Sequence, residues 1–172
     1  YDGHQHGDMG IKPDGTSEFF MTFELYHPSG NASIGVRDLP GIATVSPVAF
    51  VKVYDDYFGG HISCRGPKGV CAITNTSGPG RNMRPLEGEI FLQYIDGRVD
   101  RLVHHRSTSC GYWVEPHASI SPSGKYVIFG SDWGQETGRN GCGQSELGRG
   151  DAYVTINDPA RVERGPTNQP VR

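Results

Sequence analysis

Three histidines that recur at a nearly constant interval are the residues of this sequence best placed to do chemistry. His6, His61 and His117 lie 55 and 56 residues apart. If their imidazoles converge, they could form a tetrahedral zinc site together with the thiolate of Cys64. The alternative is structural, with each histidine hydrogen-bonded to a neighbouring repeat. Cys64 follows His61 by three positions, so on a regular strand only a bulge or turn would let both side chains bind one ion.

The N-terminal histidines offer a second spacing suited to chemistry. His4, His6 and Asp8 alternate along the chain and would share one face of a strand. This spacing can chelate a metal or orient a catalytic imidazole, so both histidines are candidate catalytic residues. The alternative is a polar strand end.

A group of polar and aromatic residues follows the predicted strand 99–105. Arg106 and Tyr112 are further candidate catalytic residues. The candidate substrate-binding residues are His104, His105 and Trp113, whose indole offers an aromatic face for stacking. The alternative for the two histidines is the end of an outer strand, with one of them solvated.

The four cysteines form no Cys-x-x-Cys pair, which argues against a four-thiolate zinc site. Cys64 and Cys71 flank the turn 65–70 and fall opposite each other in a symmetric hairpin, which predicts a cross-strand disulfide. Cys110 and Cys142 then form the other pair by elimination. A disulfide at Cys64 withdraws its thiolate from any metal, so the two predictions for Cys64 exclude each other.

Cysteine usage and two glycosylation sequons favour an oxidising compartment. The sequons begin at Asn31 and Asn75. We therefore expect a secreted or periplasmic protein. The chain begins at Tyr1 with no charged and apolar leader, so we expect a processed form or a piece of a larger protein.

The elements that must position these residues belong to a repeat of about 55 residues. Each histidine is followed nine, eight or seven positions later by a glycine, namely Gly15, Gly69 or Gly124. Runs of apolar, β-branched and aromatic residues come next and alternate in part with polar ones. The pattern predicts strands at 17–23, 34–39, 70–74, 89–95, 125–130 and 151–156, with partial fourth strands at 44–53 and 99–105.

Repeats of this length with three or four antiparallel strands are typical of β-propeller blades. We predict one all-β propeller segment over 1–172, with about three four-stranded antiparallel blades at about 4–58, 59–112 and 113–160 and a tail at 161–172. Three blades fall below the usual range of about four to eight. The outer faces of the end blades would expose apolar side chains to water, at a free-energy cost of roughly 25 cal/mol per Å² of apolar surface. Missing blades or oligomerisation would therefore complete the ring.

Composition excludes several other classes of protein. The 25 glycines and 12 prolines show no triplet period, which excludes collagen and disfavours long helices. The net charge is −3 and no basic block occurs, so no nucleic-acid partner is expected. The longest apolar runs are far below the ~20 residues that cross a bilayer, so no membrane partner is expected either.

The third repeat resembles a known type of propeller blade. Its sequence over 115–133, EPHASISPSGKYVIFGSDW, is similar to the TolB-type blade, whose core reads His, small residue, Ser-Pro-Asp-Gly and an apolar run. The first two copies have KPDG at 12–15 and GPKG at 66–69 in that place. Together with HQHGD at 4–8, GHISC at 60–64 and WVEPH at 113–117, the chain resembles the later blades of propeller polysaccharide lyases of the ulvan-lyase and oligogalacturonate-lyase type.

This resemblance implies a secreted carbohydrate-active protein that acts on uronic-acid glycans by β-elimination with a bound divalent metal ion. It further implies that the chain corresponds to the C-terminal three of about seven blades and supplies a metal-bearing platform. A catalytic base can then lie in the earlier blades. The alternative function is a non-catalytic binding or structural assembly module that self-associates through its blade faces.

Overall fold

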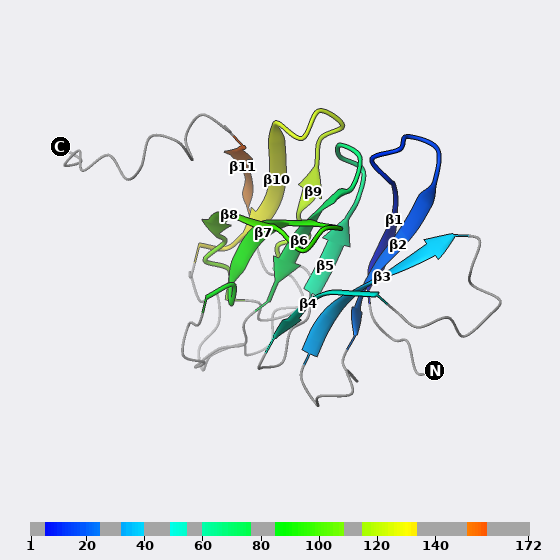
Figure 1. The fold of residues 1–172 in the computed structure, drawn as a ribbon. Helices are drawn as coiled ribbons and strands as arrows, with labels where there is room; N and C mark the ends of the chain where they lie inside the picture. The colour runs from blue at the N-terminus through cyan, green and yellow to red at the C-terminus, as the bar shows by residue number, and fades with distance from the viewer. Residues whose placement is uncertain are drawn as a thin grey trace, which may run out of the picture.

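The computed structural model describes residues 6–24, 32–39, 49–54, 60–76, 85–108, 115–133 and 151–157. In these residues the chain forms eleven β-strands arranged in three antiparallel sheets. Figure 1 shows the sheets following one another from the blue N-terminal strands to the orange last strand. The predicted all-β fold is confirmed. The described residues include no helix long and apolar enough to cross a bilayer.

Each sheet is a meander in which strands adjacent along the chain are paired. Sheet 1 consists of β1 (Gly7–Ile11), β2 (Glu18–Glu24), β3 (Ala32–Leu39) and β4 (Ala49–Tyr54). Sheet 2 consists of β5 (Gly60–Ser63), β6 (Val70–Asn75), β7 (Glu89–Tyr94) and β8 (Val99–His104). Sheet 3 consists of β9 (Ser119–Ile120), β10 (Tyr126–Ser131) and β11 (Asp151–Ile156). Sheet 3 thus has three strands, rather than the predicted four, among the described residues, which omit 134–150 and 158–172.

Alternation of side chains explains which face sheet 1 buries. Phe19, Met21 and Phe23 occupy every second position of β2 and are at most 1% exposed. Their register partners extend the same face into β3, with Met21 opposite Val36 and Phe23 opposite Ile34. Such cross-strand pairs are the unit of stabilisation in antiparallel sheets. Sheet 1 therefore presents an apolar face to sheet 2.

Sheet 2 is the middle layer and is covered on both faces. The core between sheets 1 and 2 includes Phe19, Met21, Phe23, Ile34, Val36, Cys64, Cys71, Ile73 and Phe91. The core between sheets 2 and 3 includes Val70, Ala72, Ile90, Leu92, Ala118, Ile120, Val127 and Phe129. All six residues of β6 are buried, as expected for a strand with no solvent-facing side. Sheet 2 consequently depends on both neighbours for its burial.

The x-Pro-x-Gly turns of the repeats fit each sheet against the next. Gly15, Gly69 and Gly124 have φ angles of 80°, 75° and 71°, a backbone conformation that glycine adopts without strain. A Cβ on Gly69 would lie 2.9 Å from Pro13 Cγ, and a Cβ on Gly124 would lie 2.5 Å from Pro67 Cγ. The proline of one turn therefore packs on the glycine of the following turn, and the same contact occurs at both sheet junctions.

The first strands of the three sheets are neighbours. β1 contacts β5, and β5 contacts β9. Each of these strands begins near its repeat histidine, so three equivalent strand ends meet on one side of the molecule. The described strands show three stacked sheets and not a closed ring.

Candidate metal centre

The three repeat histidines meet where the first strands begin. His6 immediately precedes β1, His61 is the second residue of β5, and His117 lies two residues before β9. The ring centroids of His6 and His61 are 4.4 Å apart, and those of His61 and His117 are 3.7 Å apart. Because the sheets stack through equivalent strands, equivalent positions of the repeat become neighbours in space.

Glu115 joins two of these histidines in a group that could hold a metal ion. One ligand atom from each of His61, Glu115 and His117 lies within 4.8 Å of the other two. Glu115 Oε2 is 2.8 Å from His61 Nε2 and 3.8 Å from His117 Nε2. Zinc bonds of about 2.0–2.1 Å in tetrahedral geometry separate ligand atoms by roughly 3.3 Å, which lies between these two distances. Two nitrogens and one oxygen are therefore close enough together to hold a metal ion.

Segment 115–118, which carries two of the three ligands, has a fixed and strained backbone. His117 has a φ of 42°, in the left-handed region that residues with a Cβ rarely adopt. Pro116 O accepts a backbone hydrogen bond from β10 at 2.8 Å. Ala118 N donates to Thr74 Oγ1 at 2.9 Å. Strain of this kind persists only where the surrounding structure imposes it, and it concentrates at functional sites.

His61 is the least exposed member of the group. Its side chain is 13% exposed, against 34% for His117 and 30% for Glu115. Burial lowers the pKa of His61, the hydrogen bond to Glu115 opposes this effect, and positive charge on His117 or His6 would lower the pKa further. Imidazole binds metal in its neutral form. Near pH 7 the site therefore keeps His61 in the form that binds metal.

The sulfur ligand predicted from the sequence is absent from this group. Cys64 is joined to Cys71 by a disulfide, and both residues are buried. A disulfide sulfur carries no thiolate charge for zinc, so the prediction of Cys64 as a metal ligand is wrong for this structure. His6, another predicted ligand, contacts the ring of His61 but lies outside the group of three. The disulfide itself indicates an oxidising, extracytoplasmic environment.

Glu115 is the member of the candidate metal group that sequence reasoning missed. It stands two positions before His117, with Pro116 between them. The residue before a proline is biased towards an extended backbone, and side chains two apart on an extended chain point to the same face. The spacing argument that grouped His4 with His6 would therefore also have grouped Glu115 with His117.

The predicted N-terminal group is described only in part. His4 lies outside the described residues, and His6 is exposed beside His61. Asp8 has a structural role, because its Oδ2 accepts a hydrogen bond from Cys64 N at 2.8 Å and its Oδ1 accepts one from Met9 N at 2.9 Å. This carboxylate therefore ties β1 to the residues that follow β5.

The two histidines at the end of β8 have different surroundings. His105 is 1% exposed, with its Nε2 3.0 Å from Asn75 O and its Nδ1 accepting a hydrogen bond from Ser107 N at 3.0 Å. Burial lowers its pKa, while the bond to Asn75 opposes the change. A ligand cannot reach a side chain buried in this way, so the substrate-binding role predicted for His105 is corrected to a structural one. His104 is exposed and lies 3.4 Å from Glu89.

The remaining candidates divide into described and undescribed residues. Arg106 is exposed and lies two residues after the end of β8. Asn75 is fully buried and its Nδ2 donates to Leu86 O at 2.9 Å, which leaves no room for a glycan, so glycosylation predicted there is not compatible with this fold. The candidates outside the described residues are Tyr112, Trp113, Asn31 and the predicted pair Cys110 and Cys142.

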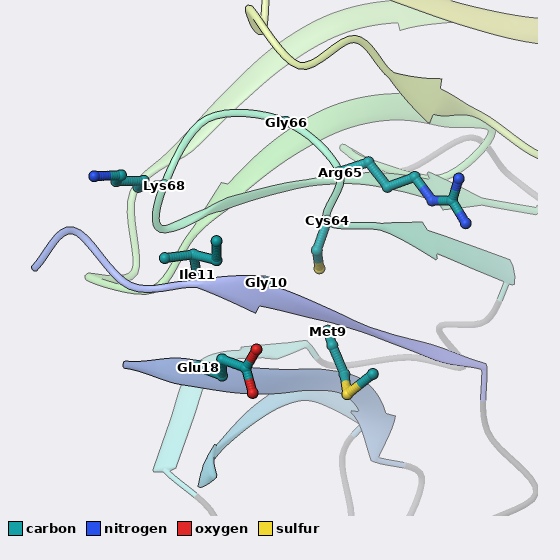
Figure 2. Close-up of a pocket in the computed structure, with 8 residues that line it drawn as sticks. All are labelled: Met9, Gly10, Ile11, Glu18, Cys64, Arg65, Gly66 and Lys68. Atoms are coloured by element: carbon teal, nitrogen blue, oxygen red, sulfur yellow. The ribbon is translucent and has the colours of Figure 1, made fainter. Parts of the chain in front are cut away.

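A pocket of about 270 Å³ lies at the other end of β1, beside the turn that follows β5. Its lining residues are Met9, Gly10, Ile11, Glu18, Cys64, Arg65, Gly66 and Lys68. Figure 2 shows the Arg65 and Lys68 side chains extending away from each other, from opposite ends of the turn. Because these two cations do not converge, and because no member of the metal group lines the pocket, we assign it no role in the chemistry.

Comparison of the chain with protein families, curated proteins and solved structures found no match.

Proposed function

We propose that this chain is a segment of a β-propeller that binds a divalent metal ion and belongs to a carbohydrate-active protein of the polysaccharide-lyase type. The observation that carries the proposal is the group formed by His61, Glu115 and His117 at the meeting point of the first strands. We further propose zinc as the ion, uronic-acid glycans as substrates and secretion or the periplasm as the location.

The propeller proposal is supported by the way the sheets stack. Each sheet is a meander, each junction repeats the proline-on-glycine contact, and the first strands are neighbours. In a propeller the first strands line the central channel, which would place the metal group at one mouth of that channel. Further blades or further copies of the chain would close the ring.

The chemistry of β-elimination sets what the site must do. A base removes the proton on the carbon next to the substrate carboxylate. The electron pair forms a carbon–carbon double bond, the bond to the leaving sugar oxygen breaks, and an acid protonates that oxygen. A divalent ion held by His61, Glu115 and His117 would stabilise the negative charge that develops on the carboxylate.

Two exposed residues of the chain could serve these steps. His6 lies beside His61 and would accept or return a proton at an imidazole nitrogen. Arg106, also exposed, would bind the carboxylate of a sugar unit and orient it. The least exposed member of the metal group, His61, would shield one ligand position from solvent.

Turnover of uronic-acid polymers tests this proposal. The full chain, stripped of metal and reloaded with zinc, is incubated with polygalacturonate, alginate and ulvan while the ultraviolet absorbance of the unsaturated product is followed. We expect absorbance to rise with zinc and to be lost on chelation or in Glu115→Gln. If the chain binds zinc yet forms no unsaturated product from any of these polymers, the lyase activity is rejected and the metal platform remains.

A second candidate function is a non-catalytic module that assembles with another copy of itself. The observation that favours it is the outer face of sheet 3, where Tyr126, Ile128, Val154 and Ile156 are 43–60% exposed. Their register pairs Tyr126 with Ile156 and Ile128 with Val154, so they form one continuous apolar patch. We propose sheet 1 of a second copy as the occupant, because sheets of this chain already pack face to face at both internal junctions. Two copies would supply six sheets, within the range of about four to eight blades.

A further inference from the structure

We infer that Arg106 and Trp133 form a subsite for an acidic sugar unit at the end of sheet 2 that also carries the candidate metal centre. The inference rests on the proposed function and names a substrate contact for it. Arg106 follows sheet 2 and Trp133 follows β10 of sheet 3, so the subsite would lie over the junction of the two sheets.

Trp133 is exposed, yet its ring is supported from the core. The side chain is 46% exposed, although indole is among the groups most favoured for burial. Its ring is stacked with that of Tyr153 at a centroid distance of 5.0 Å, and Tyr153 is stacked in turn with the buried Phe129 at 5.7 Å. Arg106 Cζ lies 5.5 Å from the Trp133 ring centroid. A cation and a supported aromatic surface are therefore presented together.

Both residues have a backbone conformation that costs energy. Arg106 has a φ of 55° and Trp133 a φ of 54°, in the left-handed region where residues with a Cβ are uncommon. These two residues contact each other on neighbouring loops. Strained non-glycine residues of this kind cluster at ligand-binding sites.

Buried hydrogen bonds hold the two loops together in this arrangement. Ser131 Oγ donates to His105 O at 2.6 Å and accepts from Trp133 N at 2.9 Å. Asp132, which is 7% exposed, accepts hydrogen bonds from the backbone N and the hydroxyl of Thr108. Both loops are therefore fixed before any ligand arrives, which lowers the entropic cost of binding.

The same network connects the subsite to the metal group. His61 is the register partner of Thr74, the residue before Asn75. Asn75 O is bonded to His105 Nε2, and His105 directly precedes Arg106. The two places therefore lie at the same end of sheet 2, within one continuous set of contacts.

An acidic sugar is the ligand that matches these two groups. The C–H face of a pyranose ring stacks on indole, and a guanidinium binds a carboxylate through two parallel hydrogen bonds. A nucleic acid would demand several cations along its backbone, and the chain as a whole carries a net charge of −3. One indole and one guanidinium therefore match a single sugar unit that carries one carboxylate.

Binding of trigalacturonate, with its methyl ester as the uncharged probe, tests the inference. Affinities are measured by calorimetry on the full chain in the presence of chelator, so that neither metal nor turnover contributes. We expect Trp133→Ala to weaken binding of both probes by about tenfold or more. Arg106→Gln should weaken the acid by about tenfold and change the ester by less than about twofold. Trp133→Phe should retain most of the affinity, which separates loss of stacking from misfolding.

A matched control exists at the opposite end of sheet 2. Arg98 lies in the turn between β7 and β8, and its side chain is 58% exposed. Its Cζ is 3.6 Å from the ring centroid of Tyr94, the last residue of β7. Arg98→Gln removes the same chemistry from a place without a subsite and should leave both affinities unchanged. Equal losses in Arg98→Gln and Arg106→Gln, or unchanged binding in Trp133→Ala, would overturn the inference. Binding without elimination would reject the lyase activity alone, whereas elimination with an unchanged KM in Trp133→Ala would reject the subsite alone.

Discussion

At the residue scale, His105 shows how a buried imidazole links sheets 2 and 3. Its ring is hydrogen-bonded to Asn75 O and to Ser107 N, while its own carbonyl accepts the hydroxyl of Ser131. Because Ser107 N donates to Nδ1, the neutral ring carries its proton on Nε2. Protonation of Nδ1 would break the bond from Ser107 and bury a charge.

This arrangement makes the stability of the fold depend on pH. The folded-state pKa of His105 is lowered by burial below its ordinary value of 6.5. Above pH 6.5 the stabilisation is fully present, and as the pH falls below 6.5 the unfolded chain takes up the proton first. We expect the free energy of unfolding to decrease by up to about 1.4 kcal/mol per pH unit for this histidine.

Chemical denaturation at several pH values from about 7.5 down to about 5 measures this slope. His61, whose pKa is also lowered, contributes a slope of its own. His105→Gln should therefore show a shallower dependence than the wild type, together with lower stability at neutral pH. An unchanged slope in His105→Gln would contradict the assignment.

Part of the candidate site was predictable from the sequence at this scale. The interval between His6, His61 and His117 was enough to predict their meeting, because equivalent positions of a repeat become neighbours when the repeats stack. Glu115 was missed although its spacing from His117 carried the signal. The burial of His105 was not predictable, since no local pattern distinguishes it from the exposed His104.

At the scale of elements, the disulfide joins the two ends of the turn after β5. It closes a short loop, for which the chain-entropy treatment gives a stabilisation of about 2 kcal/mol. We expect the double substitution Cys64→Ala and Cys71→Ala to lower the free energy of unfolding by about that amount while zinc affinity stays unchanged, as measured by denaturation and by metal titration. A loss of zinc binding would mean that Cys64 is a ligand after all.

The turn glycines provide a second test at this scale. Gly124→Ala would place a Cβ 2.5 Å from Pro67 Cγ at a φ of 71°, so we expect a loss of about 1–3 kcal/mol in the free energy of unfolding. Gly130→Ala is the matched control, because among the described residues its Cβ would meet no atom closer than Glu115 O at 3.7 Å, and it should change stability by less than about 0.5 kcal/mol. Similar losses in both variants would show that the proline-on-glycine contact does not hold the sheets together.

Strands with clear alternation or long apolar runs were predictable from the sequence. The predictions 17–23, 70–74 and 151–156 match β2, β6 and β11 to within one residue at each end. The four-residue β5 and the two-residue β9 carry too few side chains for a period to show, and only their position after the repeat histidines indicated them.

At the scale of the whole molecule, the stacking of like sheets leaves an apolar patch on sheet 3. Ile128 and Val154 are directly opposite each other in register and are 47% and 60% exposed. The combined substitution Ile128→Glu and Val154→Lys replaces this pair by opposite charges, which keeps the strands paired while removing the apolar surface. We expect the wild-type chain to self-associate and the double variant to be monomeric with an unchanged circular dichroism spectrum.

Sedimentation velocity over a range of concentrations decides between these states. A wild-type chain that stays monomeric at the highest concentration would reject a second copy as the occupant and leave the face to other blades. Equal self-association of the double variant would show that copies meet through a different surface.

The stack of three sheets was predictable because each repeat carries more apolar strand surface than it can bury alone. The order of the layers followed from chain order, since short turns keep consecutive meanders adjacent. Whether the stack closes into a ring depends on its outer faces, which contact no further sheet within the described residues. No local sequence pattern predicts what covers these faces.

Anomalous diffraction at the zinc edge, from crystals of the full chain grown with zinc, tests the central claim most directly. We predict one strong peak bonded at about 2.0–2.2 Å to His61, Glu115 and His117, with a fourth position taken by solvent. A zinc-loaded crystal with no peak among these three residues, or with its peak on other ligands, would contradict the claim that stacking of the repeats builds a metal centre.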